Sequence, residues 1–176
     1  RLAAHLGLAF IIFIALVWVG YQIRNHDFSP KSSRTKPLKA HYWACWGMLG
    51  ITIVWGAFVA GLDAGLVYNT WPLMGQTLIP TEPFTIFSIL TDPVWVQFFH
   101  RWIAIVTSIA ILAFAWRTQD ALIAFAILLQ VGLGIAALLT QVWIPVAAMH
   151  QAGAFIVVLS LLNNAYADVY NNPDTP

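Results

Sequence analysis

The chain has 176 residues, of which 60% are hydrophobic and only 9% are charged, and its formal net charge is +1. A water-soluble domain of this length could not hide so much apolar surface, so the composition indicates an integral membrane protein. We therefore predict membrane lipids, and no nucleic acid, among its partners. The single cysteine, Cys45, excludes an internal disulfide.

Five apolar segments, each close to the 20 residues that a hydrocarbon core requires, are predicted as transmembrane helices. In chain order they are 2–22, 42–62, 97–116, 121–140 and 146–166. The short turns between the last three make these helices antiparallel neighbours. The prediction is an all-α integral membrane protein with five transmembrane helices, four of which form an antiparallel four-helix bundle.

The charges in the connections predict the side of the membrane on which each connection lies. The first connection is basic and is expected inside, with Arg24, Lys31, Arg34, Lys36 and Lys39. The loop 63–96 has no Lys or Arg but contains Asp63, Glu82 and Asp92, so we expect it outside. Even spacing of the helices then leaves the tail, 167–176, inside.

Three histidines, His5, His100 and His150, lie near the starts of predicted helices, and the charge pattern puts all three at the outer face. A histidine inside a bilayer is costly unless it faces the bundle interior and finds a partner. Three at one depth suggest a ligand set, and neutral imidazoles in an apolar bundle suit a heme iron better than a hard cation. His100 and His150 are the best axial pair, because alternate helices of one bundle can make them face each other. The alternative is that each only hydrogen-bonds a nearby carbonyl group.

Arg101 stands beside His100, and Lys and Arg are otherwise nearly absent from the outer side. It can pair with heme propionates, or it can be an interfacial anchor whose charged end reaches the water. Gln130 is interpreted as an interhelical hydrogen-bond donor or acceptor. Small helix residues, among them Gly56 and Gly134, are interpreted as sites of close helix approach.

Two stretches share the pattern H-x-x-x-A-F-I, one beginning at His5 and the other at His150. Both open a predicted helix that runs inward, which suggests two related halves that each end in a histidine-bearing helix. The chain begins at Arg1 without a lead-in, so we expect a fragment. Its predicted parts are the last transmembrane helix of a missing N-terminal half (1–22), a basic inner loop (23–41), a C-terminal four-helix heme-binding half (42–166) with its outer loop (63–96), and an inner tail (167–176).

Four segments of the chain resemble the heme A synthase family, in the order that the family has them. They are the loop Gly61-Leu-Asp63-Ala-Gly65-Leu-Val-Tyr68-Asn69-Thr70-Trp71-Pro72-Leu73-Met74 with Ile79-Pro80, the pair His100-Arg101, the triplet Met149-His150-Gln151, and the opening Arg1-Leu2-Ala3-Ala4-His5-Leu6-Gly7. The resemblance implies an eight-helix protein of two pseudo-symmetric halves. In it, a heme b lies between His100 and His150, and His5 is a ligand of the substrate heme O in the other half.

The resemblance also implies an oxidoreductase that converts the C8 methyl group of heme O to a formyl group, giving heme A for cytochrome c oxidase. The family's proposed catalytic glutamate matches no residue here, so we expect this chain alone to be inactive. Implied partners are heme O, heme O synthase and cytochrome c oxidase assembly factors. The implied location is the bacterial cytoplasmic membrane or the mitochondrial inner membrane, with the heme sites towards the outer face.

Two other functions fit part of the sequence. A bis-histidine membrane cytochrome that only carries electrons would need His100 and His150 but not the family's loop. A cofactor-free membrane assembly protein would use the histidines only as hydrogen-bonding groups.

Overall fold

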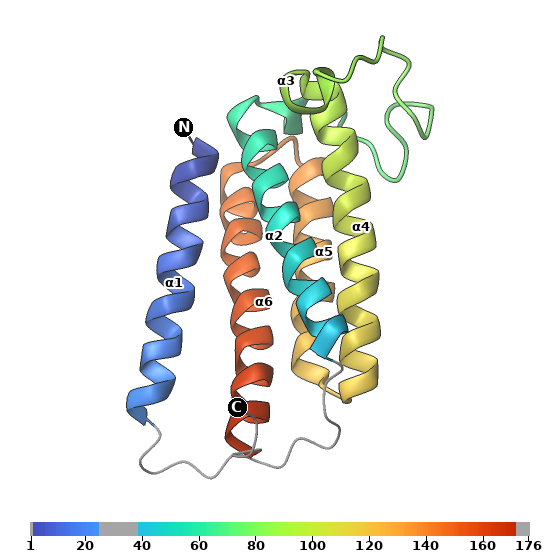
Figure 1. Cartoon of the computed structure of the whole chain (residues 1–176). Coiled ribbons are helices and arrows are strands. Elements are labelled where there is room, and N and C mark those ends of the chain that lie inside the picture. Colours follow the sequence, from blue (N-terminus) through green and yellow to red (C-terminus); the bar gives the residue numbers. More distant parts are fainter. Residues whose placement is uncertain (1, 25–38, 172–176) are drawn as a thin grey trace.

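The computed structural model describes residues 2–24 and 39–171, and the side chains of 4–23 and 39–164. The described elements are α1 (Leu2–Arg24), α2 (Lys39–Gly61), the 3-10 helix η1 (Ala64–Leu66), α3 (Ser88–Thr91), α4 (Pro93–Thr118), α5 (Ala121–Leu139) and α6 (Ile144–Asn171) (Figure 1). Five of these helices are long and apolar enough to cross a membrane. The predicted all-α membrane fold with five spanning helices is therefore confirmed. Most of the predicted basic loop, including Lys31, Arg34 and Lys36, lies outside the described residues.

Polar residues at the helix ends explain why some helices begin where they do. The Asp92 side chain accepts a hydrogen bond from the Val94 N–H group (2.9 Å), and Pro93 occupies the first turn, where its missing N–H costs nothing. As a result α4 begins four residues before its predicted start. Asp120 caps α5 in the same way, by accepting from the N–H groups of Leu122 (3.0 Å) and Ile123 (3.2 Å).

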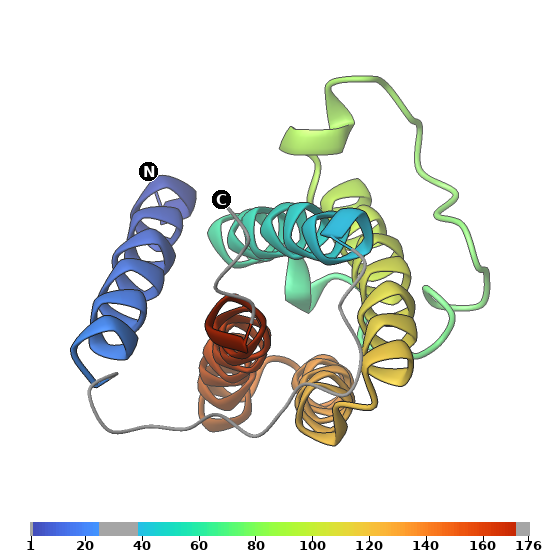
Figure 2. The same cartoon turned by 60° about the horizontal axis from the view of Figure 1, so that its bottom comes forward.

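The five long helices pack mainly as sequence neighbours. α2 contacts α4, α4 contacts α5 and α5 contacts α6, while α1 touches α2 and α6. Figure 2 shows α2, α4, α5 and α6 grouped around a common axis, with α1 standing at the side of this group. In Figure 1 the chain rises through α2 and α5 and descends through α4 and α6.

The two ends of the bundle differ in what fills them. One end carries residues 62–92, and we call it the loop end. The half away from it, which we call the core half, holds a cluster of buried apolar side chains that includes Ile111, Phe114, Ile123 and Leu161. α1 joins this cluster through Phe10, whose ring stacks on that of Phe155 with the ring centres 4.2 Å apart.

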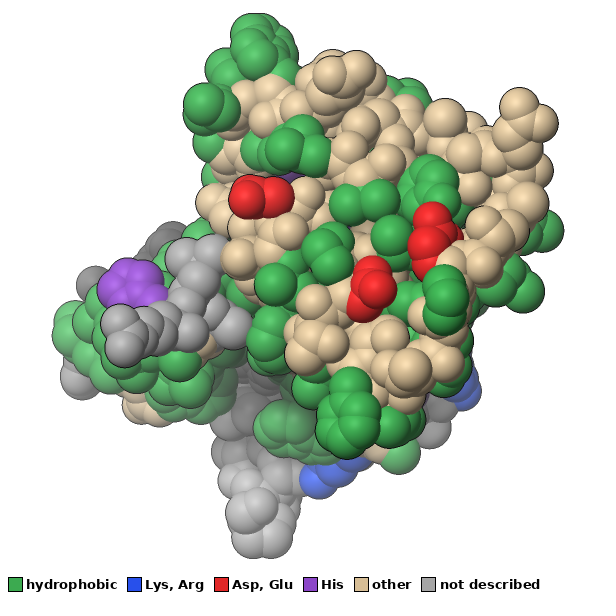
Figure 3. All heavy atoms as spheres, turned by 90° about the horizontal axis from the view of Figure 1, so that it is seen from above, with side chains coloured by type: hydrophobic (Ala, Val, Ile, Leu, Met, Phe, Trp, Pro, Cys, Tyr) green, Lys and Arg blue, Asp and Glu red, His purple; other side chains and the backbone are tan. Residues whose placement is uncertain are grey.

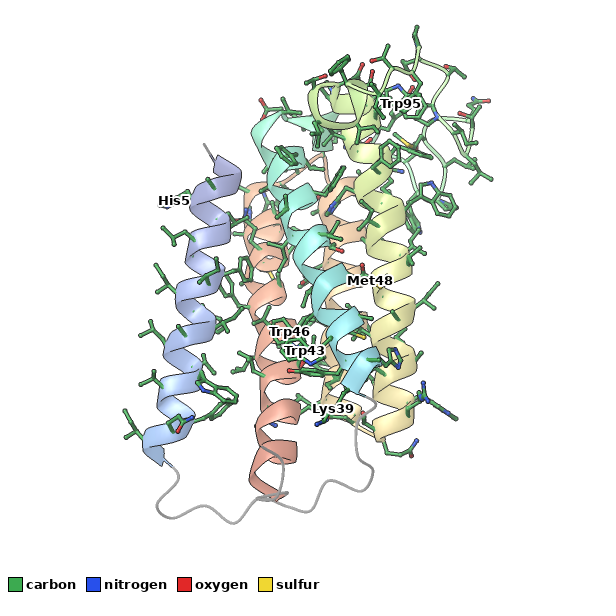
Figure 4. The ribbon with its side chains drawn as sticks, viewed as in Figure 1. His5, Lys39, Trp43, Trp46, Met48 and Trp95 are labelled. Atoms are coloured by element: carbon green, nitrogen blue, oxygen red, sulfur yellow. The ribbon has the colours of Figure 1, made fainter. Side chains whose placement is uncertain are left out.

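The charges also distinguish the two ends. Figure 3 looks onto the loop end, where Asp and Glu side chains appear on the face and the visible Lys and Arg side chains lie at its margin. Lys39, Trp43 and Trp46 lie towards the opposite end of the molecule from Trp95 (Figure 4). The acidic end is therefore the end that contains the loop 63–96, which the sequence predicted to lie outside because it has no Lys or Arg.

Candidate functional site

His100 and His150 lie about two helical turns from the starts of their helices, and both starts are at the loop end. The Asp92–Pro93 cap fixes the register of α4, and Pro145 stands in the first turn of α6. Both side chains are partly buried. Each ring faces a glycine of a neighbouring helix at this depth, so the two imidazoles lie at the same end of the bundle.

A glycine of the neighbouring helix faces the His100 ring. A Cβ atom placed on Gly56 of α2 would lie 3.2 Å from the His100 Cε1 atom. Because this separation is tighter than ordinary van der Waals contact, the ring occupies space that any larger residue at position 56 would take. The His100 Nδ1 atom is buried and has no hydrogen-bond partner among the described residues.

His150 has a similar environment on α5. A Cβ atom on Gly134 would lie 2.8 Å from the His150 Cε1 atom, and the buried Nδ1 atom again lacks a described partner. Below the ring, the Gln130 Nε2 atom donates to the His150 carbonyl oxygen (3.0 Å). This bond joins α5 to α6, as predicted for Gln130.

The alternative in which the histidines hydrogen-bond nearby carbonyls applies in part to His150, whose imidazole interacts with the backbone of Gln130. The buried Nδ1 atoms of both rings nevertheless lack a hydrogen-bond partner among the described residues. A buried polar atom without a partner costs about 1–3 kcal/mol. Two such atoms at the loop end therefore make it a candidate ligand-binding site.

Arg101 has partners that the sequence did not suggest. Its Nη1 atom donates to the carbonyl oxygens of Thr70 (2.9 Å) and Leu73 (3.1 Å), and its Nη2 atom donates to that of Tyr68 (2.7 Å). The side chain is only 9% exposed, so it is not an anchor whose charged end reaches the water. Its Nε atom is buried without a described acceptor, as is the Nε1 atom of Trp55 on α2.

His5 does not join the other two histidines. It is exposed on α1, the helix at the side of the bundle (Figure 4). Among the residues that the structure describes, no three His, Cys, Asp or Glu side chains form a metal-ion site. In the described part of the chain, the structure therefore does not bring His5 to the place where His100 and His150 lie.

Sequence reasoning missed the role of Gly56 and Gly134, which were interpreted as packing residues. They are the helix glycines that face a histidine ring, whereas a Cβ atom added to Gly50 or Gly132 would meet nothing within 4 Å. The sequence did contain a hint, because each of these glycines lies at about the same predicted membrane depth as a histidine. This hint could not be used without knowing which helices are neighbours.

Comparisons with known proteins agree with the resemblance found in the sequence. The model of the COX15-CtaA family, described as cytochrome oxidase assembly protein, matches residues 1–162. The chain is 46% identical over 126 residues to a heme A synthase of Rhodospirillum centenum (strain ATCC 51521 / SW), a match that covers 66% of this chain and 32% of the relative. It is 40% identical over 121 residues to the human heme A synthase COX15, covering 65% of this chain and 30% of the relative.

The chain spans about a third of the length of the curated relatives that it matches. No solved structure matches it. The family model, by contrast, covers nearly the whole chain, including α1, the loop and both histidine-bearing helices of the bundle. The chain belongs to the COX15-CtaA family of cytochrome oxidase assembly proteins, the family of the heme A synthases.

Proposed function

We propose that this chain is the C-terminal heme-binding part of a heme A synthase, and that His100 and His150 are the axial ligands of a heme b. The observation that carries the proposal is the pair of imidazoles at the loop end of the bundle, each facing a glycine of a neighbouring helix and each with a buried Nδ1 atom that lacks a described hydrogen-bond partner. A neutral imidazole binds iron through either ring nitrogen, and two of them favour a low-spin centre.

The surrounding residues suit this group. Because Gly56 and Gly134 carry no side chain, the neighbouring helices leave the space that the two imidazole rings occupy. The buried N–H donors at the same end, Trp55 Nε1 and Arg101 Nε, are of the type from which a heme propionate accepts a hydrogen bond. The bound iron would supply one-electron redox chemistry, while the residues of the chain hold it and exclude water.

The activity proposed for the whole protein is oxidation of the C8 methyl group of heme O to a formyl group, which yields heme A. We assign His5 to the heme O site rather than to the bundle, because its exposed position on α1 makes the imidazole accessible to groups beyond the bundle. In this proposal 1–22 belongs to an N-terminal half and 42–166 forms the C-terminal half.

The proposed location is a bacterial cytoplasmic membrane or a mitochondrial inner membrane, with the loop end on the periplasmic or intermembrane side. Heme O synthase and cytochrome c oxidase assembly factors are the proposed partners. The electron-carrier alternative would use the same histidine pair, but it gives no account of the family match in α1 and the loop.

The test is a reduced-minus-oxidised spectrum and a pyridine hemochrome of the purified protein in detergent. We expect a low-spin b-type signal that is lost in His100→Ala and in His150→Ala. His41→Ala is the matched control, because the His41 ring bonds the Ala110 carbonyl oxygen (3.0 Å) in the core half. A wild-type spectrum in both site variants would contradict the axial assignment, provided that circular dichroism shows them folded.

A further inference from the structure

The polar side chains that fasten the loop end come from the same stretch of α4 as His100. The Arg101 guanidinium group donates three hydrogen bonds, of 2.7–3.1 Å, to carbonyl oxygens of residues 68, 70 and 73. Gln97, one turn earlier, donates from Nε2 to the Tyr68 carbonyl oxygen (3.1 Å). Together these two side chains bind the backbone of residues 68, 70 and 73, which belong to one short loop segment.

A second fastening comes from the loop itself. The Asn69 Nδ2 atom donates to the Gly65 carbonyl oxygen (2.8 Å) and to the Leu138 carbonyl oxygen at the end of α5 (3.0 Å). The segment is thus bound to α5 as well as to α4. The Leu138 carbonyl oxygen also accepts from the Gln141 N–H group (3.1 Å), so the bond from Asn69 adds a second donor at the end of this helix.

The same segment is packed into the bundle. Ala64 is fully buried and Met74 is 3% exposed, although both lie in a connection between helices. A Cβ atom on Gly65 would lie 2.8 Å from the Val142 side chain in the turn between α5 and α6. In Figure 2 the short helix η1 appears inside the ring formed by α2, α4, α5 and α6. We call residues 62–75 the roof.

The attachment points of the roof bracket the histidine pair. Arg101 follows His100 directly, and Leu138 lies one turn beyond Gly134, which faces His150. Val142 lies in the turn before α6, the helix that carries His150. The segment is thus fixed to α4 directly after His100 and to the end of α5 near Gly134.

We infer that Arg101 is a positioning residue whose main role is to fasten the roof over the histidine site, and that the closed roof keeps water-soluble reagents from the heme. This inference rests on the proposed function for the identity of the bound group, but not for the fastening. It assigns the Arg101 charge to three backbone carbonyls, where each N–H···O bond is strengthened by the charge of the donor. The pairing of this charge with propionates becomes secondary.

The experiment is amide hydrogen exchange of the purified protein in detergent, with and without bound heme, read on peptides that cover 66–75. The amides of Val67 and Gly75 are hydrogen-bonded within the roof, and that of Met74 to the Thr77 carbonyl oxygen just beyond it, so they report its closure. We expect about tenfold faster exchange in Arg101→Gln and in Asn69→Ala, which converts to about 1.4 kcal/mol of roof opening. Arg117→Gln, at the other end of α4, is the matched control and should leave roof exchange unchanged.

Asn69→Ala separates the roof from a charge effect, because this variant leaves every charge in place. Faster roof exchange in both variants, with faster oxidation of the reduced heme by added ferricyanide, supports the inference. Unchanged exchange in both variants overturns the inference. It is also overturned if Arg101→Gln, but not Asn69→Ala, loses heme while its roof exchange stays as slow as in the wild type. Amide exchange is also measured without heme. A protein that binds no heme would therefore contradict the proposed function, while the exchange rates would still test whether Arg101 fastens the roof.

Discussion

The core half and the loop end are built from the same helices, but different kinds of side chain fill their interiors. In the core half, Ile111, Ile123 and Leu161 are fully buried and Phe114 is 1% exposed, so apolar side chains fill the interior among themselves. At the loop end, glycines stand opposite histidine rings, and an arginine is buried beneath a loop.

The distribution of unpaired polar atoms makes the difference plain. Nine buried side-chain N or O atoms lack a hydrogen-bond partner in the described part of the chain, and only those of Trp46 and Asn164 are near the apolar core. The others lie at or towards the loop end. A region that is complete in itself stabilises the fold, whereas a region with unpaired polar groups is where a ligand is expected.

The largest effect should come from breaking the core half. Phe114→Ala removes a ring that packs against His41 and Tyr42, and should lower the free energy of unfolding by about 3–5 kcal/mol. Phe125→Ala, at a ring that is 63% exposed on α5, is the matched control and should cost much less. Unfolding in detergent titrated with SDS measures both. Equal losses would remove the distinction between an interior and a lipid-facing position.

A single methyl group should act in opposite directions at neighbouring positions of α5. Gly134→Ala places a Cβ atom 2.8 Å from His150, so we expect the free energy of unfolding to fall by about 1–3 kcal/mol and the heme spectrum to change. Gly132→Ala meets nothing within 4 Å and should raise the free energy by up to about 1 kcal/mol through helix propensity. The same sign for both variants in SDS unfolding would show that the His150 ring does not need the space.

At the histidine site, replacing a polar side chain should cost little when no heme is bound. His150→Leu removes a buried Nδ1 atom that lacks a partner, and so removes a penalty of about 1–3 kcal/mol while part of the packing is lost. We expect the heme-free variant to be as stable as the wild type, or up to about 1 kcal/mol more stable. A large loss of stability in heme-free protein would mean that the imidazole already has a structural partner.

The smallest effect should be a pH dependence in the loop. The Tyr68 hydroxyl donates to Glu82 Oε1 (2.6 Å), and this bond lowers the pKa of Glu82 below its ordinary 4.5 and raises the pKa of Tyr68 above its ordinary 10. The stability that Glu82 contributes is therefore complete above pH 4.5 and is lost as the pH falls through its lowered pKa. The Tyr68 contribution is complete below pH 10 and is lost as the pH rises through its raised pKa.

Because this pair lies near the surface, solvent screening keeps the effect small. The protection of the amides in 76–87, measured as their exchange rate relative to the unfolded peptide at the same pH, should fall at both pH extremes in the wild type. Tyr68→Phe should remove the fall in protection at high pH and reduce the one at low pH. A Tyr68→Phe profile identical to that of the wild type would show that the bond does not stabilise the loop.

The sequence predicted the helices well because their signal is local. Length and hydropathy locate a membrane span, and Asp120 caps the first residues of α5 from the position just before it. The predicted start of α4 was four residues late, because hydropathy alone does not show the Asp92–Pro93 cap. The pairing of Gln130 with the next helix was also predictable, since a polar side chain in the middle of a span has few other partners.

The site was less predictable because its geometry is not local. His5 shares a helix pattern with His150, yet it lies exposed on α1, since the pattern does not tell which side of a helix meets the bundle. The partners of Arg101 are backbone carbonyls of a loop about 30 residues earlier, and no residue type in that loop announces them. Only the path of the chain brings them together.

The buried Arg101 has a consequence for biosynthesis. A charged residue costs about 2.5–3.5 kcal/mol at the centre of an inserting helix, and less towards its end. The carbonyl groups of Tyr68, Thr70 and Leu73 precede Arg101 in the chain, so the ribosome delivers them before α4 is complete. When α4 enters the membrane, the acceptors for its charge have therefore already been made, and the order of synthesis favours insertion of this helix.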